Sequence, residues 1–182
     1  MNPRRGPRRS AACALCALSF AFAGCIGSSP PAAPVRWFDA TPDAVAGRDP
    51  AVPVDVRVEA AAHVGREFLV RTAPRELVVD AQNGWLVDPR SIVAAAVERA
   101  CGGGSSSGAV LRIEIERFEL DVAVAPRVHV RVVVRGDGPS RVVEQVVDAA
   151  DRTPESMAAA MAIAVARVAE DVASKLAPVE TR

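Results

Sequence analysis

The stretch Leu111-Arg112-Ile113-Glu114-Ile115-Glu116-Arg117-Phe118-Glu119-Leu120 decides the fold of this chain. Up to Glu116 the apolar residues alternate with charged ones, as in a β-strand with one buried face. From Phe118 the apolar residues continue at Leu120, Val122 and Val124, so the pattern has moved by one residue. Because a one-residue slip would turn the apolar side chains into water, the sequence predicts a β-bulge or bend near Glu116-Arg117.

Further strands are predicted on both sides of this stretch. Downstream, Gly136-Asp137-Gly138-Pro139 returns the chain into residues 141–148, which predicts a β-hairpin. Its first strand carries valine at every second position, at Val128, Val130, Val132 and Val134. Upstream, Val52, Val54, Val56 and Val58 alternate in the same way, and Pro53 indicates an edge strand or a strand start. Two shorter apolar runs, residues 67–71 and 76–80, are expected to be successive strands.

Two helices are predicted from their caps and their periodicity. Asp88 and Thr153 can each cap a helix whose first position is proline, Pro89 or Pro154. The first helix has apolar residues at Ile92, Val93, Ala96, Val97 and Ala100, and Gly102-Gly103-Gly104 ends it. The second has an apolar seam at Met157, Met161, Val165, Val168, Val172 and Leu176, and Pro178 stops it. The order of elements predicts an α+β fold, a mainly antiparallel sheet with two helices packed on one face.

Composition limits the classes of function. The chain has 182 residues, 22 basic and 22 acidic, and loss of its four N-terminal arginines with a signal peptide would leave 18 basic against 22 acidic, a net charge of −4, which argues against a nucleic-acid partner. His63 and His129 are the only histidines, and neither has partners at a metal-ligand spacing, so no metal site is expected. Walker A and GxGxxG motifs are absent from the sequence. The sequence therefore predicts no catalytic residues.

His129 lies among Arg127, Arg131 and Arg135 on the face opposite the valines. The favoured interpretation is a solvated face paired with acids such as Glu114 and Glu116 on a neighbouring strand. An anion or lipid-headgroup patch is the alternative interpretation.

Cys101 and Trp85 are the other two side chains with chemical interest. Cys101 follows the first predicted helix, where the helix dipole raises the pKa of a thiol, so a buried bystander is favoured over a nucleophile. Trp85 comes just before the same helix. It is expected either to cover the end of the core or to be an exposed partner interface.

The N-terminus has the pattern of a lipoprotein signal peptide, residues 1–24. Four basic residues (Arg4, Arg5, Arg8 and Arg9) precede an apolar run of about the length of a signal h-region, too short to span a bilayer. The run ends in Phe22-Ala23-Gly24-Cys25, which looks like a bacterial lipobox. Cleavage before Cys25 and lipidation of its sulfur by diacylglycerol, with an N-acyl chain on the new amino group, are expected. An ordinary secretory signal is the alternative.

Residues 25–34 are predicted to be a lipidated cysteine and a Pro/Ser-rich tether. The tether has no apolar periodicity and would reach about 20 to 25 Å at roughly 3.1 Å per residue. Ile26 stands where an Asp would favour retention at the inner membrane, so the periplasmic face of the outer membrane is the expected location. Residues 35–182 are then one α+β domain.

The layout of this domain resembles the ABC-type transport auxiliary lipoproteins, the lipid-anchored subunit that accompanies Mce-domain transporters such as the paraquat-inducible system. The resemblance rests on the order and spacing of four segments and the Ala-rich closing helix. The segments are Arg36-Trp37-Phe38, Phe68-Leu69-Val70-Arg71, the helix entry from Trp85 to Pro89, and Leu111 to Ile115 leading to Phe118.

The resemblance implies a non-enzymatic docking subunit that moves phospholipid or other hydrophobic molecules across the periplasm together with an Mce-domain protein and ABC transporter subunits. No cofactor is implied beyond the acyl chains on Cys25, and self-association is left open. Two alternatives remain: a lipoprotein activator or assembly factor for cell-wall synthesis or secretion, and an envelope thiol enzyme that uses Cys101.

Overall fold

The computed structural model describes residues 33–47, 54–102, 110–136 and 138–176. The predicted signal peptide, the lipobox with Cys25 and nearly all of the tether lie outside these residues, as do Val52, Pro53 and the end of the glycine run after the first helix. The described residues from Pro34 onward belong to one compact unit.

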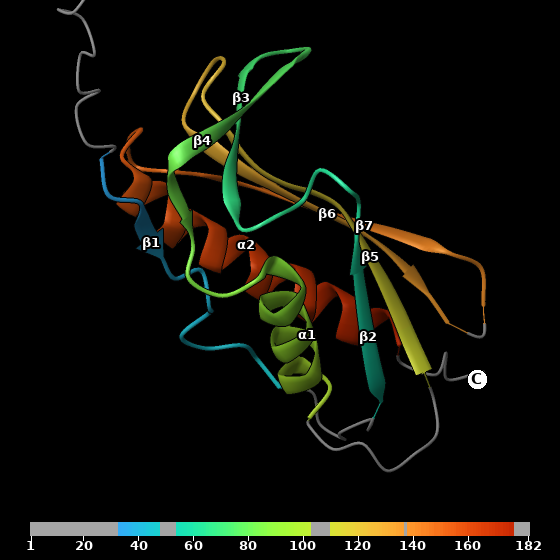
Figure 1. The fold of residues 1–182 in the computed structure, drawn as a ribbon. Helices are drawn as coiled ribbons and strands as arrows, with labels where there is room; N and C mark the ends of the chain where they lie inside the picture. The colour runs from blue at the N-terminus through green and yellow to red at the C-terminus, as the bar shows by residue number, and fades with distance from the viewer. Residues whose placement is uncertain (1–32, 48–53, 103–109, 137, 177–182) are drawn as a thin grey trace, which may run out of the picture. The chain divides into compact units, whose positions relative to one another are not determined.

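Seven strands and two helices make up the described part of this unit (Figure 1). In chain order they are β1 (Arg36–Phe38), β2 (Asp55–Ala60), β3 (Glu67–Ala73), β4 (Glu76–Trp85), α1 (Pro89–Ala100), β5 (Val110–Asp121), β6 (Arg127–Arg135), β7 (Arg141–Asp148) and α2 (Pro154–Lys175). The fold is therefore α+β, as predicted.

The sheet is mixed, with strand order β1-β4-β3-β5-β6-β7 and β2 paired to β5. Neighbours β3–β4, β5–β6 and β6–β7 are antiparallel, whereas β1–β4, β2–β5 and β3–β5 are parallel. The prediction of a mainly antiparallel sheet was therefore wrong. The physical reason is the length of β5, because one edge of this strand receives both β2, along Val110 to Ile115, and β3, at Leu120 and Asp121.

The predicted bulge lies where the sequence pattern changes phase. The register between β5 and β6 shifts between Ile115 and Arg117, so Glu116 is the extra residue. As a result Ile113 and Ile115 before the bulge and Phe118 after it are all buried in one core. A bulge lets the apolar side chains on both sides of it face the core, whereas regular pairing would have turned those after Glu116 towards solvent.

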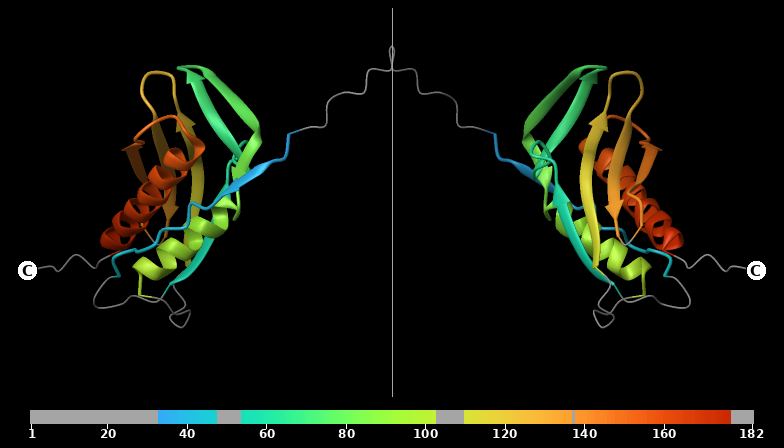
Figure 2. Two further views of the ribbon diagram at one scale, coloured as in Figure 1. Left: turned by 90° about the vertical axis from the view of Figure 1, so that its left-hand side faces the viewer. Right: turned by 90° about the vertical axis from the view of Figure 1, so that its right-hand side faces the viewer.

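Both helices begin as predicted. The Asp88 side chain accepts a hydrogen bond from the Arg90 amide, the Thr153 side chain accepts one from the Ser156 amide, and proline occupies the first turn of each helix. The apolar residues of α1 and α2 join the valine face of β6 in a single core, and the two helices pack against each other (Figure 2). Packing of this apolar seam, more than helix propensity, holds a helix in place.

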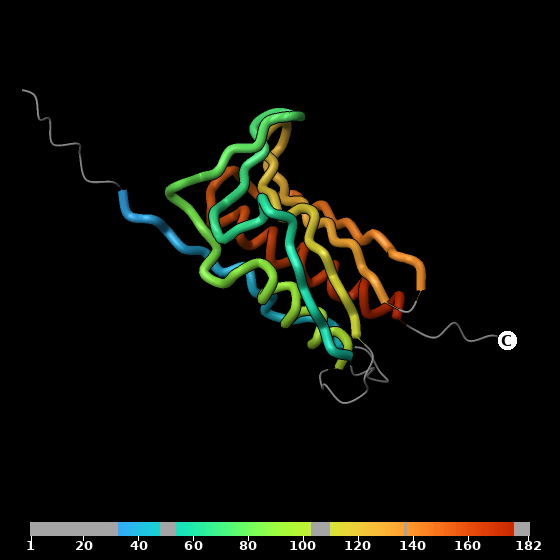
Figure 3. The backbone as a smooth tube through the Cα atoms, turned by 45° about the vertical axis from the view of Figure 1, so that its right-hand side comes forward, coloured from blue at the N-terminus to red at the C-terminus, as the bar shows by residue number. Residues whose placement is uncertain are grey.

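The β3–β4 hairpin extends to the end of the sheet away from α1 (Figure 3). Residues 67–71 and 76–80, predicted as two strands, are the arms of this hairpin, and the second arm continues to Trp85. The β6–β7 hairpin is also as predicted.

Candidate docking surface and the polar sheet face

Trp85 belongs to the core. Its side chain is 1% exposed, and its ring lies 4.2 Å from that of Phe68 and 5.2 Å from that of Phe118, measured between centroids. Phe38 extends this aromatic cluster through Phe68. The interpretation of Trp85 as an exposed partner interface is therefore wrong. Trp85 is the last residue of β4 and pairs there with Phe38, and the Trp85 ring lies on the core side of the sheet.

Trp37 is the exposed tryptophan, with half of its surface accessible. The Arg66 guanidinium lies 4.8 Å from the centre of its ring. A Cβ at Gly84 would come within 2.7 Å of the same ring, so the glycine lets the indole lie directly against β4. Sequence reasoning missed this surface. The usable signal was alternation, because adjacent strand residues point to opposite faces and only one of Trp37 and Phe38 can enter the core.

The β3–β4 hairpin also carries exposed apolar side chains. Leu77, Val78 and Val79 follow one another on β4, and each exposes about two fifths or more of its surface. Consecutive strand residues point to opposite sides, so the hairpin presents apolar side chains on both of its faces. Exposed apolar side chains clustered on one strand in this way point to an interaction site.

The outer edge of β4 is also open along most of its length. β1 pairs only with Asn83, Gly84 and Trp85, and β3 occupies the opposite edge. In the described part of the chain, residues 76–82 therefore have no strand on their outer side. An apolar strand with an open edge can accept a further strand by backbone hydrogen bonding. We call residues 76–82 the β4 edge and regard it as the candidate docking surface.

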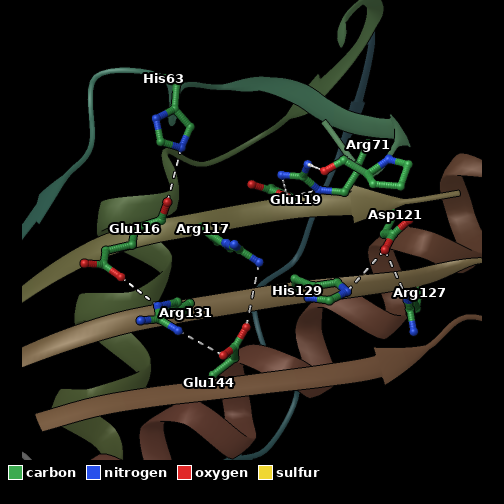
Figure 4. Close-up of polar contacts among 11 residues, drawn as sticks. His63, Arg71, Glu116, Arg117, Glu119, Asp121, Arg127, His129, Arg131 and Glu144 are labelled. Atoms are coloured by element: carbon green, nitrogen blue, oxygen red, sulfur yellow. Dashed lines mark hydrogen bonds and ion pairs between the residues drawn. The ribbon is translucent and has the colours of Figure 1, made fainter. Parts of the chain in front are cut away.

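The sheet face away from the helices carries a network of ion pairs (Figure 4). Arg131 donates hydrogen bonds to Glu116 at 2.7 Å and to Glu144 at 3.2 Å. Arg135 pairs with Glu114 at 2.8 Å. These contacts confirm the predicted pairing of the β6 arginines with acids on neighbouring strands.

Part of this network is buried. Glu119 is 2% exposed and accepts hydrogen bonds of 2.9 and 2.8 Å from Nε and Nη2 of Arg71. Nearby, an Asp121 carboxylate oxygen lies 3.2 Å from Nε of Arg127 and 3.4 Å from Nε2 of His129. The buried end of the face thus lies beside β3, whose Arg71 side chain contacts Glu119.

Burial sets the charge of His129. Desolvation lowers its pKa below the ordinary value, and this outweighs the opposing attraction of the Asp121 carboxylate. For Asp121, burial raises the pKa, but hydrogen bonds from the Ala123 amide and Arg127 reverse the shift, so that its pKa is lowered. His129 is therefore neutral near pH 7 beside an ionised Asp121.

Cys101 and His63 are not brought together as a catalytic pair by any described contact. Cys101 is 2% exposed at the C-terminal cap of α1, whereas His63 is exposed and its Nε2 lies 3.2 Å from the Glu116 carbonyl oxygen. Among the described residues no three His, Cys, Asp or Glu side chains are grouped as metal ligands would be. No described helix is long and apolar enough to cross a membrane.

Comparison with known proteins shows the fold alone. No protein-family model and no curated protein matches the sequence. Protein XCC0632 from Xanthomonas campestris, described under the family model DUF330, is 20% identical with a TM-score of 0.63, over 75% of this chain and 91% of that one. A second structure, described as an uncharacterized protein, is 12% identical with a TM-score of 0.61, over 79% of this chain and 99% of that one.

Proposed function

We propose that this protein is a non-enzymatic docking subunit, anchored to the envelope through Cys25, of an Mce-type ABC transport system for phospholipid or other hydrophobic molecules. The observation that carries the docking role is the β4 edge, where Leu77, Val78 and Val79 are exposed beside an open strand edge. The sequence pattern at Phe22-Ala23-Gly24-Cys25 supports the lipid anchor.

The β4 edge suits a protein partner better than a small molecule. Its polar groups are backbone amides and carbonyls in a line, which another strand satisfies along its whole length. Leu77 and Val79 on one face of β4, and Val78 on the other, would then contact apolar side chains of the added strand. Diacylglyceryl and N-acyl chains exceed the single chain that gives only marginal attachment, so the partner would be held at a membrane surface.

The test is co-purification from detergent-solubilised membranes, with the bound proteins identified by mass spectrometry. We expect an Mce-domain protein to co-purify with the wild-type chain. The double variant that combines Leu77→Lys and Val79→Lys should no longer co-purify with it, because two charges would be buried in the interface. Ile163→Lys is the matched control, since Ile163 is a similarly exposed aliphatic residue on α2.

Two outcomes contradict the proposal. One is recovery of a penicillin-binding protein or a secretion pore in place of the Mce-domain protein. The other is full recovery of the partner by the doubly charged hairpin variant. The anchor is checked in the same cells, where Cys25→Ser is expected to lose labelling by a palmitate analogue.

A further inference from the structure

Three arginines stand in one row across the sheet face that carries the ion pairs. Arg57 of β2 is in register with Arg112 of β5, and Arg112 is in register with Arg135 of β6. All three side chains are exposed. Neighbouring strands lie about 4.8 Å apart, so three positive charges are held side by side. Like charges directly opposite one another destabilise a sheet.

Two of the three arginines in this row are paired with nearby acids, and the central one is not. Arg57 turns to Asp55 of its own strand, with Nη2 and Oδ2 at 3.0 Å, and Arg135 pairs with Glu114. Both pairs are substantially exposed, and pairs of this kind are weak. Arg112, at the centre of the row, makes no ion pair with any residue that the structure describes.

A row of glutamates lies two residues further along the same strands. Glu59 is in register with Glu114, about 7 Å from the arginine row at roughly 3.3 Å per residue. Within the described residues Glu59 has no ion-pair partner either. Arg112 and Glu59 are thus diagonal neighbours of opposite charge on adjacent strands, and no ion pair joins them among the described residues.

A hollow of about 310 Å³ lies between the two rows. It is lined by Arg57, Glu59, Arg112, Ile113, Glu114 and Arg135. One side offers guanidinium groups, whose planar forks bind phosphate oxygens in pairs. The other side offers carboxylates, which bind an ammonium group. The hollow therefore favours a ligand with both charges a short distance apart over a simple anion.

We propose that this hollow binds a phosphate group that carries an amine, as in phosphoethanolamine, either as a lipid headgroup or as its soluble glycerol ester. Arg112 takes the phosphate at the centre of the row, with Arg57 and Arg135 on either side, and Glu59 takes the ammonium. The assignment rests on the register of β2, β5 and β6 and not on the docking function, which uses the β4 edge.

The test is calorimetric titration of the full-length protein, in phosphate-free detergent, with glycerophosphoethanolamine. We expect saturable binding that Arg112→Gln weakens at least about tenfold, as for loss of a hydrogen-bonded charge. Glu59→Gln should weaken binding of glycerophosphoethanolamine and leave binding of inorganic phosphate unchanged. Arg117→Gln is the matched control, an exposed arginine on β5 whose nearest ion-pair partner is Glu144 at 4.0 Å.

Circular dichroism and the melting temperature establish that each variant is folded. If Arg112→Gln does not fold, Arg112→Lys replaces it, because lysine keeps the charge but loses the paired hydrogen bonds and should still weaken binding. A wild-type protein that does not bind glycerophosphoethanolamine overturns the proposal. Equal affinity for inorganic phosphate, or equal weakening by Arg117→Gln, overturns it as well.

A further arm separates the two sources of the ligand. Phosphatidylethanolamine and phosphatidylcholine are compared in mixed micelles of the same detergent. Binding of phosphatidylethanolamine that depends on Arg112 identifies a lipid headgroup as the ligand. Arg112-dependent binding of the glycerol ester alone identifies the free soluble form.

Discussion

Replacement of Trp85 by alanine measures how much of the fold depends on the aromatic cluster under β4. Removal of a buried tryptophan costs about 3–5 kcal/mol. Trp85 makes ring contacts at 4.2 and 5.2 Å, and each such pair adds about 0.5–1.5 kcal/mol beyond area burial, so we expect the upper part of that range. At about 4–5 kcal/mol, and about 2–4 °C per kcal/mol for a domain of about this size, the melting temperature should fall by about 8–20 °C.

The second tryptophan provides the comparison. Trp37 is half exposed, and its main partner is the Arg66 guanidinium, so Trp37→Ala should cost no more than about 1 kcal/mol. Urea unfolding followed by circular dichroism measures both variants without depending on tryptophan fluorescence. Because the chain has two tryptophans, Trp37→Phe leaves Trp85 alone, and its emission should resist quenching by acrylamide. Equal destabilisation by the two alanine variants would refute the placement of Trp85 in the core.

Trp85→Phe tests a finer point of the same site. The indole Nε1 is buried and finds no hydrogen-bond acceptor among the described residues. A buried donor left unsatisfied costs about 1–3 kcal/mol, and phenylalanine removes this donor while it keeps one ring in the cluster. We therefore expect Trp85→Phe to lose less than about half of what Trp85→Ala loses. A loss as large as that of alanine would contradict this account of the indole nitrogen.

Two further predictions concern the polar face. His129 has a lowered pKa in the folded protein, so as the pH falls the unfolded chain takes up the proton first, and the free energy of unfolding should decrease below about pH 6.5. In urea titrations between about pH 7 and 5, His129→Gln should therefore lose less stability than the wild-type protein. Identical losses in the two proteins would contradict the prediction. Glu119→Gln leaves the partly buried Arg71 without its counter-charge and should destabilise the fold by about 3 kcal/mol in the same assay. Glu114→Gln, in a more exposed pair, should cost less than about 1 kcal/mol, and similar losses for the two variants would show that burial of Glu119 does not matter.

Features set by neighbouring residues could be predicted from the sequence. The bulge at Glu116 follows from a change of phase within one strand, and the starts of α1 and α2 follow from a capping residue and the proline after it. The pairing of the β6 arginines with Glu114 and Glu116 follows from alternation on adjacent hairpin strands. In each case the physical cause acts within a few residues or across a tight turn.

The parallel pairs could not be predicted in the same way. β2 and β5 are separated by the β3–β4 hairpin and by α1, and no turn fixes their register. The sequence shows that Val56 and Val58 share a face, but it does not show which strand lies beside them. The same limit applies to Trp85, because its burial depends on β1 and on Phe118, which are distant in the chain.

The arginine row illustrates why register carries information that strand patterns lack. A shift of two residues between β2 and β5 would keep Val56 and Val58 on the core face and would place Arg57 opposite Glu114, a favourable pair. The chain instead sets Arg57 opposite Arg112, in the register that pairs Val56 with Leu111 and Val58 with Ile113. Val56 and Val58 pack against the core on the same face in either register, so their burial does not choose between the two, and the repulsion between exposed charges, less than about 1 kcal/mol, is small enough for the fold to tolerate. The arginine row is therefore a surface repulsion that the fold tolerates, and a phosphate group at Arg112 with its amine beside Glu59 is the chemistry that would relieve it.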